Sequence, residues 1–183
     1  LDGTHPEWGA ADENAIYAIF YPTTTVITAK ADESCKTFGG YHGDTPAGGK
    51  TIVYAVLPRC PVPNEPQIDG VTEALSHELI EAATDPRPTT APAFVMADAD
   101  HFAWGLTMGS ELGDMCGFDD YRIRPVELGF VVQRTWSNRA AAAGKHPCVP
   151  QPSGQLYFNA VPTLADRVDM DLGADKLETA GIR

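Results

Sequence analysis

The longest apolar runs in the chain predict three substantial strands. Residues 15–21 and 51–57 are apolar and aromatic, and a proline directly follows each run. Runs of this length that end at a proline are typical of mostly buried strands. Residues 127–136 predict a third substantial strand, and residues 25–28 and 93–96 predict two short ones.

One segment, residues 70–84, predicts a long helix. Asp69 stands at the N-cap position, and Asp85-Pro86 ends the segment because a residue before proline avoids the helical region. Residues 35–49 are rich in Gly, Asp and Pro and predict a turn-rich connection. Several strands around one helix predict a single α+β domain over residues 1–150. Residues 151–183 predict the start of a C-terminal β extension.

The two faces of the predicted helix differ in character. At 100° per residue, Leu75 and Leu79 lie on an apolar back. His77 and Glu81 lie one turn apart on another face, with Glu78 about 100° around the helix from His77. This polar face is where the sequence predicts chemistry.

The charge balance excludes several classes of partner. The chain carries 25 acidic and 13 basic residues, a formal net charge of -12. A nucleic-acid or anionic-lipid partner needs a basic face, so we expect neither. No apolar run approaches the roughly 18 residues of a membrane span. The loop-like opening at Leu1, without an initiator Met or signal peptide, predicts a processed or truncated chain with which a cleaved upstream segment could remain associated.

Four cysteines predict two disulfides. Cys35, Cys60, Cys116 and Cys148 form no Cys-x-x-Cys motif, and four cysteines allow three pairings. Cys35–Cys60 and Cys116–Cys148 are favoured because each closes a local loop without crossing the other. The alternative is four buried thiols in a cytosolic protein.

The segment His77-Glu78-Leu79-Ile80-Glu81 predicts a metal site on the helix. Donors at i and i+4 can converge on one ion, and the residue after the first donor can take a proton from a bound water. Glu81 stands where zinc peptidases carry a second His; its carboxylate binds zinc but widens the choice to manganese or calcium. The alternative is a solvated ridge of charged helix residues that also includes Glu73.

A third ligand has to come from outside this helix. Glu111 and Asp114 lie in an acidic stretch before Cys116, and either could instead accept the second ring proton of a metal-bound His. Further acidic or histidine candidates are Asp85, Asp98, Asp100 and His101. His42 could line the site, although a turn histidine bonded to the backbone is favoured.

The helix and its exit, residues 74–86, resemble the corresponding segment of the EXORDIUM / phosphate-induced extracellular proteins and their secreted bacterial relatives. Three stretches agree in the same order: residues 35–43, 54–58 and 111–116. Residues 132–138 also resemble the closing strand of the bacterial members. The resemblance covers roughly residues 16–148, and it implies that an upstream part of the family's domain is absent from this chain.

The resemblance implies a secreted, disulfide-stapled, zincin-like domain in which a mixed or antiparallel sheet packs on one long active-site helix. It places five residues in one site: His77, Glu78, Glu81, Glu111 and Asp114. We therefore expect a zinc-dependent hydrolase, a metallopeptidase or a degenerate relative, acting on a peptide or cell-wall substrate. His77 and Glu81 would hold zinc with Glu111, Asp114 would orient a ligand, and Glu78 would be the general base. The alternative is a non-catalytic extracellular cell-wall or carbohydrate-associated protein with a structural cation.

Overall fold

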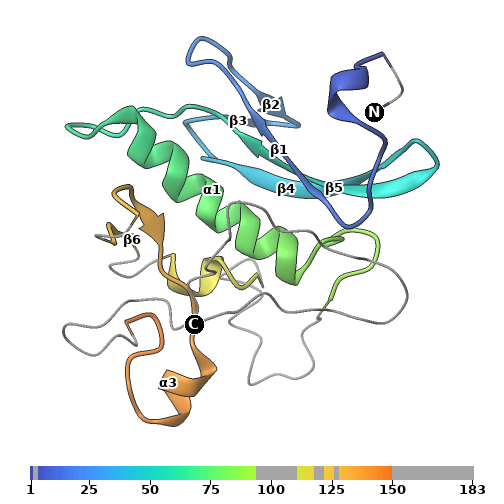
Figure 1. Ribbon diagram of the computed structural model, residues 1–183. Helices are drawn as coiled ribbons and strands as arrows, with labels where there is room; N and C mark the ends of the chain where they lie inside the picture. The colour runs from blue at the N-terminus through green and yellow to red at the C-terminus, as the bar shows by residue number, and fades with distance from the viewer. Residues whose placement is uncertain (2–3, 94–110, 118–121, 126–127, 150–183) are drawn as a thin grey trace.

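The computed structural model describes residues 1, 4–93, 111–117, 122–125 and 128–149 (Figure 1). Within these residues the chain is a mixed α+β protein with small sheets, one main helix and two disulfides, as predicted. The predicted strand over 93–96 falls almost wholly outside the described residues. The predicted extension over 151–183 and the ligand candidates Asp98, Asp100 and His101 also lie outside them.

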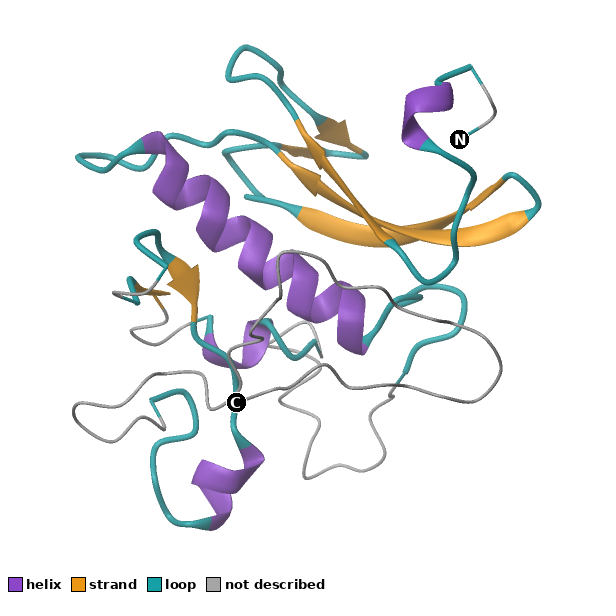
Figure 2. Ribbon diagram, in the orientation of Figure 1, coloured by secondary structure: helices purple, strands orange, loops and turns teal. Residues whose placement is uncertain are grey.

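The main sheet has three strands in the order β1-β5-β4 (Figure 2). The central strand β5 (Lys50–Leu57) pairs in parallel with β1 (Ile16–Phe20) and antiparallel with β4 (Tyr41–Ala47), so the sheet is mixed. The apolar run of β5 supplies most of the buried core of the sheet: Ile52, Val53, Ala55, Val56 and Leu57. The predicted strands over 15–21 and 51–57 are confirmed in position.

Strand β4 occupies part of the segment that was predicted to be turns. It joins β5 through a two-residue hairpin, in which Gly48 and Gly49 both have positive φ. Such turns favour glycine because L side chains rarely adopt this conformation. Pro46 is tolerated in β4 because the strand lies at an edge of the sheet, where a missing N–H costs little. The turn prediction for this segment was therefore wrong over β4.

Three other strand predictions need correction. β1 is less buried than predicted, because as the other edge strand it leaves Ile19 and Phe20 exposed. The predicted strand over 25–28 overlaps β2 (Thr28–Ala29), which pairs with β3 (Asp32–Glu33), at one residue only. Within 127–136 the described strand is β7 (Val132–Gln133), paired with β6 (Arg122–Ile123); Gly129, at φ 71°, interrupts the extended run before it.

Helix α1 (Gln67–Thr84) confirms the predicted helix but begins three residues earlier. The N-cap residue is Pro66, so the prediction that Asp69 caps the helix was wrong. Asp69 is instead buried inside the first turn, where its carboxylate pairs with Arg124. The helix ends as predicted, with Asp85 as its C-cap.

Helix α1 lies between the main sheet and the strands β6 and β7 (Figure 1). It contacts β5, β4 and β1 on one side and β7 on the other. The short elements are the 3-10 helices η1 (Pro6–Trp8) and η2 (Asp114–Cys116) and the helix α3 (Asn138–Ala142), which Ser137 caps through its side chain. No helix in the described part of the chain is both long and apolar enough to cross a bilayer.

Both predicted disulfides are confirmed. Cys35–Cys60 joins the segment before β4 to the connection after β5, with 5.0 Å between the Cα atoms. Cys116–Cys148 joins η2 to the segment after α3, with 5.6 Å between the Cα atoms. On the chain-entropy account each bridge stabilises the fold by about 3 kcal/mol.

Candidate metal centre

Helix α1 buries its acidic face rather than its leucines. Glu78 is 4% exposed and Glu81 is 2% exposed, whereas Leu79 is 36% exposed. An ionised carboxylate is costly to bury unless cations or hydrogen-bond donors compensate its charge. The alternative of a solvated ridge was therefore wrong for Glu78 and Glu81, and the surroundings of these two side chains define the centre.

Two glycines make room for the buried carboxylates. A Cβ on Gly40 would lie 2.6 Å from Oε1 of Glu78, and a Cβ on Gly113 would lie 2.6 Å from Oε1 of Glu81. Contacts this short are essentially never found for real side chains, so any larger residue would displace the carboxylate. The chain before β4 and the chain before η2 thus close on α1 from either side.

His77 offers Nε2 to the centre and uses Nδ1 to hold its ring in place. Nδ1 lies 2.7 Å from Oε1 of Gln133 on β7, and the amide nitrogen of Gln133 donates to the carbonyl of Gly113. Because the amide oxygen can only accept, Nδ1 of His77 is the donor. In the neutral ring, Nε2 then carries a lone pair, 3.0 Å from Oε1 of Glu81 and 3.6 Å from Oδ1 of Asp114.

His42, on β4, is held in the complementary way. Its Nε2 lies 3.0 Å from the backbone carbonyl oxygen of Asp85 and 3.3 Å from Oε1 of Glu111, so Nε2 is the donor. Its Nδ1 faces the centre, 3.4 Å from Oε2 of Glu81 and 3.7 Å from Oε2 of Glu78. The prediction that His42 bonds to the backbone is thus confirmed, but the prediction that it lies in a turn was wrong, because it lies on β4. His42 also lines the site.

These contacts form two donor groups that share Glu81. His77, Glu81 and Asp114 can each offer one ligand atom within 4.8 Å of the others, and so can His42, Glu78 and Glu81. Ligands about 2.1 Å from an ion, at angles of roughly 90–120°, lie about 3.0–3.6 Å apart. The nitrogen–oxygen separations across the two groups, 3.0 to 3.7 Å, are close to that range.

The carboxylates strongly perturb both histidines. Burial acts to lower the pKa of His42, but the facing carboxylates of Glu78 and Glu81 and the charge of Glu111 outweigh it and raise the pKa to about 10. Burial also acts to lower the pKa of His77, but Glu81 and Glu78 raise it to about 9. Both rings therefore bind protons at neutral pH when no cation is present.

The acidic residues are perturbed by burial and by one another. Burial and the charge of Glu81 raise the pKa of Glu111 to about 7 and the pKa of Asp114 to about 6. For Glu81 itself, burial acts to raise the pKa, but hydrogen bonds to His42 and His77 outweigh it, so the pKa is lowered. Protons and histidine charges offset the crowded carboxylates in the metal-free protein; a divalent cation could do the same.

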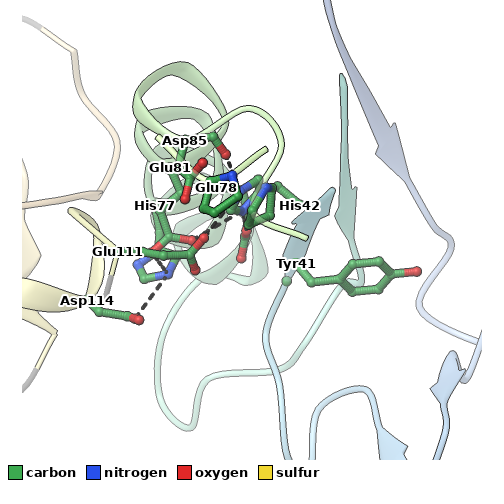
Figure 3. A pocket seen from close by; sticks show the side chains of 11 residues that line it. Tyr41, His42, His77, Glu78, Glu81, Asp85, Glu111 and Asp114 are labelled. Carbon is green, nitrogen blue, oxygen red and sulfur yellow. Dashed lines mark hydrogen bonds and ion pairs between the residues drawn. The ribbon is translucent and has the colours of Figure 1, made fainter. Parts of the chain in front are cut away.

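The centre opens into a cavity of about 430 Å³. Figure 3 shows the imidazoles and carboxylates converging from β4, α1 and the segment around η2, whereas the ring of Tyr41 points away from them. The described histidines and carboxylates that line the cavity are His42, His77, Glu78, Glu81, Asp85, Glu111 and Asp114. All five residues that the resemblance to the EXORDIUM proteins implies for one site line this cavity.

The structure assigns the two acidic residues outside α1 to different histidines. The carboxylate of Asp114 approaches His77, and that of Glu111 approaches His42. Gln133, rather than an acidic side chain, accepts the second ring proton of His77. Sequence reasoning missed Gln133, because nothing in its neighbourhood in the sequence links it to a helix 56 residues earlier.

Comparisons of the chain with protein-family models, curated proteins and solved structures found no match. The resemblance to the EXORDIUM proteins therefore stays a prediction. The function has to be inferred from the centre itself.

Proposed function

We propose that the chain is an extracellular zinc-dependent hydrolase of the peptidase type. The observation that carries this proposal is the burial of Glu78 and Glu81 against two histidines at the floor of an open cavity. Two disulfides within this one chain favour an oxidising, extracellular setting.

The residues best suited to hold the zinc are His77, Glu81 and Asp114. Nε2 of His77 is free to coordinate because Gln133 fixes the proton on Nδ1. An imidazole donor favours zinc over calcium, which prefers six to eight oxygen ligands. Zinc bound there would act as a Lewis acid and lower the pKa of a coordinated water towards neutrality.

Glu78 is the proposed general base. It follows His77 directly in α1 and lines the same cavity, and its buried Oε2 has no hydrogen-bond partner in the described part of the chain. His42 faces this oxygen, but its Nδ1 lies 3.7 Å away, beyond hydrogen-bond distance, so the oxygen can still take a proton from a water in the cavity. The adjoining cavity also favours an enzyme over a structural ion, since structural zinc sites are closed by four protein ligands.

Substituting Glu78 and His77 separately tests the proposal. With one equivalent of zinc, Glu78→Gln should keep the ion and the fold but lose roughly 10²–10⁴-fold in hydrolysis of a peptide library, because the general base is gone. His77→Ala should lose the ion itself, measured by equilibrium dialysis and elemental analysis.

The matched control is Glu73→Gln, on the same helix. Glu73 forms an ion pair with Arg122, outside the cavity, so its variant should hydrolyse peptides like the unaltered protein. A zinc-loaded protein that cleaves no peptide, and that Glu78→Gln does not change, would favour the non-catalytic extracellular protein with a structural cation.

A further inference from the structure

We infer that the centre has a second cation position, formed by His42, Glu78 and Glu81, in which Glu81 bridges the two ions. The inference concerns the regulation of the proposed hydrolase and in that respect rests on the proposed function. The position itself is defined by side chains independently of any activity.

The two histidines are arranged around the two oxygens of one carboxylate. Oε1 of Glu81 lies 3.0 Å from Nε2 of His77, and Oε2 of Glu81 lies 3.4 Å from Nδ1 of His42. Each ring uses its other nitrogen to donate to a carbonyl oxygen, from Gln133 or Asp85. Each neutral ring therefore directs a lone pair towards its own oxygen of Glu81, which is the geometry of a bridging carboxylate between two ions.

A buried and unsatisfied oxygen marks the second position. Oε2 of Glu78 is buried, has no hydrogen-bond partner among the residues that the structure describes, and lies 3.7 Å from Nδ1 of His42. The Glu78 side chain as a whole is 5% exposed. Buried polar atoms in folded proteins nearly always have partners, and a buried carboxylate oxygen that lacks a hydrogen bond and faces a ring nitrogen of a histidine fits a cation position.

The charge around Glu81 also calls for more than one divalent ion. Five carboxylates line the cavity with two histidines: Glu78, Glu81, Asp85, Glu111 and Asp114. With neutral histidines and all five carboxylates ionised, one divalent ion leaves three negative charges uncompensated and two ions leave one. Uncompensated buried charge is costly, so the second ion stabilises the centre.

The second ion should bind more weakly than the first. The side chains of His77 and Asp114 are 22% and 30% exposed, so the first ion can keep contact with water. The side chains of His42, Glu78 and Glu81 are each at most 5% exposed, so the second ion must shed its hydration shell. Once bound it coordinates Glu78, takes this carboxylate out of proton transfer and inhibits hydrolysis.

Zinc binding measured by equilibrium dialysis and elemental analysis tests the second position. We expect two zinc ions per chain at saturation in the unaltered protein, and one in both His42→Ala and Glu78→Gln. Glu78→Gln keeps the shape of the side chain, so it decides the question if His42→Ala fails to fold. The control His5→Ala removes an exposed histidine that lines a different cavity, and it should keep both ions.

Two results would overturn the second position: one ion at saturation in the unaltered protein, or two ions in both variants. Peptide hydrolysis by the unaltered protein should rise through the first equivalent of zinc and fall roughly 100-fold or more through the second. Hydrolysis that the second ion leaves unchanged would overturn the inhibitory role. If the protein hydrolyses no peptide at any ratio of zinc to protein, the proposed function is rejected. The number of zinc ions bound per chain then tests the second position by itself.

Discussion

At the scale of single residues, the centre depends on which atom of each side chain is already engaged. His77 and His42 have the same ring, but Gln133 engages Nδ1 of the first and the Asp85 carbonyl engages Nε2 of the second. The opposite nitrogens therefore face Glu81 from two sides. Fixing one ring nitrogen sets the tautomer and the direction of the other, which is what a metal ligand requires.

Replacing either of two glycines by alanine should weaken zinc binding at the centre. In Gly113→Ala the new methyl group would displace the carboxylate of Glu81, and in Gly40→Ala it would displace that of Glu78. We expect Gly113→Ala to weaken the first zinc ion by roughly 10–100-fold, and Gly40→Ala to weaken the second ion to a similar extent, measured by competition with a chelator.

Gly39→Ala is the matched control for the glycine variants. A Cβ at this position would meet no atom within 4 Å, and the residue does not have positive φ, so zinc binding should not change. Equal zinc affinities for all three variants would show that the close approach of the glycines to α1 does not position the carboxylates.

The sequence could reveal the residues of the centre that share one helix, but not those that join it from elsewhere. The i, i+4 spacing suggested His77 and Glu81 as a ligand pair, with a solvated ridge as the alternative. His42 was considered but was predicted to lie in a turn, because Gly43 and Pro46 hide the strand around it. Gln133 has no charge and no motif, so only the fold shows that its amide reaches His77.

At the scale of elements, the apolar runs predicted β1, β5 and α1, but they did not predict which face of α1 is buried. Strand β5 is central and its run is continuous, whereas the edge strand β4 alternates small and polar residues and resembles a loop. Helix α1 contacts the sheet on one side and β7 on the other. Because α1 has contacts on both sides, its acidic face is enclosed. A helix that packs against a single layer would instead leave its polar face exposed to solvent.

Element η2 should depend on its disulfide to present Asp114 to the centre. Cys116 lies two residues after Asp114 and is tied to Cys148. Removing this bridge by Cys116→Ser with Cys148→Ser should lower the free energy of unfolding by about 3 kcal/mol. It should also weaken the first zinc ion by roughly 10–100-fold, because the third ligand is no longer held in place.

The other bridge provides the comparison. Cys35→Ser with Cys60→Ser should cost a similar amount of stability, but it should leave the affinity for the first zinc ion nearly unchanged, because none of His77, Glu81 and Asp114 lies next to either cysteine. Thermal unfolding and zinc competition distinguish the two pairs. A similar loss of zinc affinity in both pairs would mean that overall stability, not the anchoring of η2, controls the site.

At the scale of the whole molecule, the centre is assembled from segments that are distant in the sequence. Strand β4 brings His42, α1 brings His77 with its neighbours, and η2 brings Asp114 (Figure 3). Strand β7 adds Gln133, which holds the ring of His77. The mixed α+β class could be predicted because it depends on local patterns. The enclosure of the acidic cluster could not, because it depends on two layers that meet on opposite sides of α1.

This assembly should give the metal-free protein a stability that decreases as the pH rises. In the folded chain the pKa values of His42 and His77 are raised from 6.5 to about 10 and 9, and those of Glu111 and Asp114 are raised from 4.5 and 3.8 to about 7 and 6. A group with a raised folded pKa stabilises the fold while it is protonated and loses that contribution as the pH rises through the folded value. Glu81 has a lowered pKa and acts in the opposite sense, but only near and below its ordinary value of 4.5. Between pH 6 and 10 the four raised groups therefore decide the sign.

Zinc should counteract this dependence, because deprotonation of the histidines and carboxylates creates the ligands that the ion binds. We expect the free energy of unfolding, measured by urea titration in the presence of a chelator, to fall steadily between pH 6 and pH 9. The free energy of unfolding with saturating zinc should exceed the value with chelator by an amount that grows over the same pH range. The reason is that protons compete less with zinc for His77 and His42 as the pH rises. Parallel curves with and without zinc would mean that the ion binds away from these titrating groups, and both proposed cation positions would then be wrong.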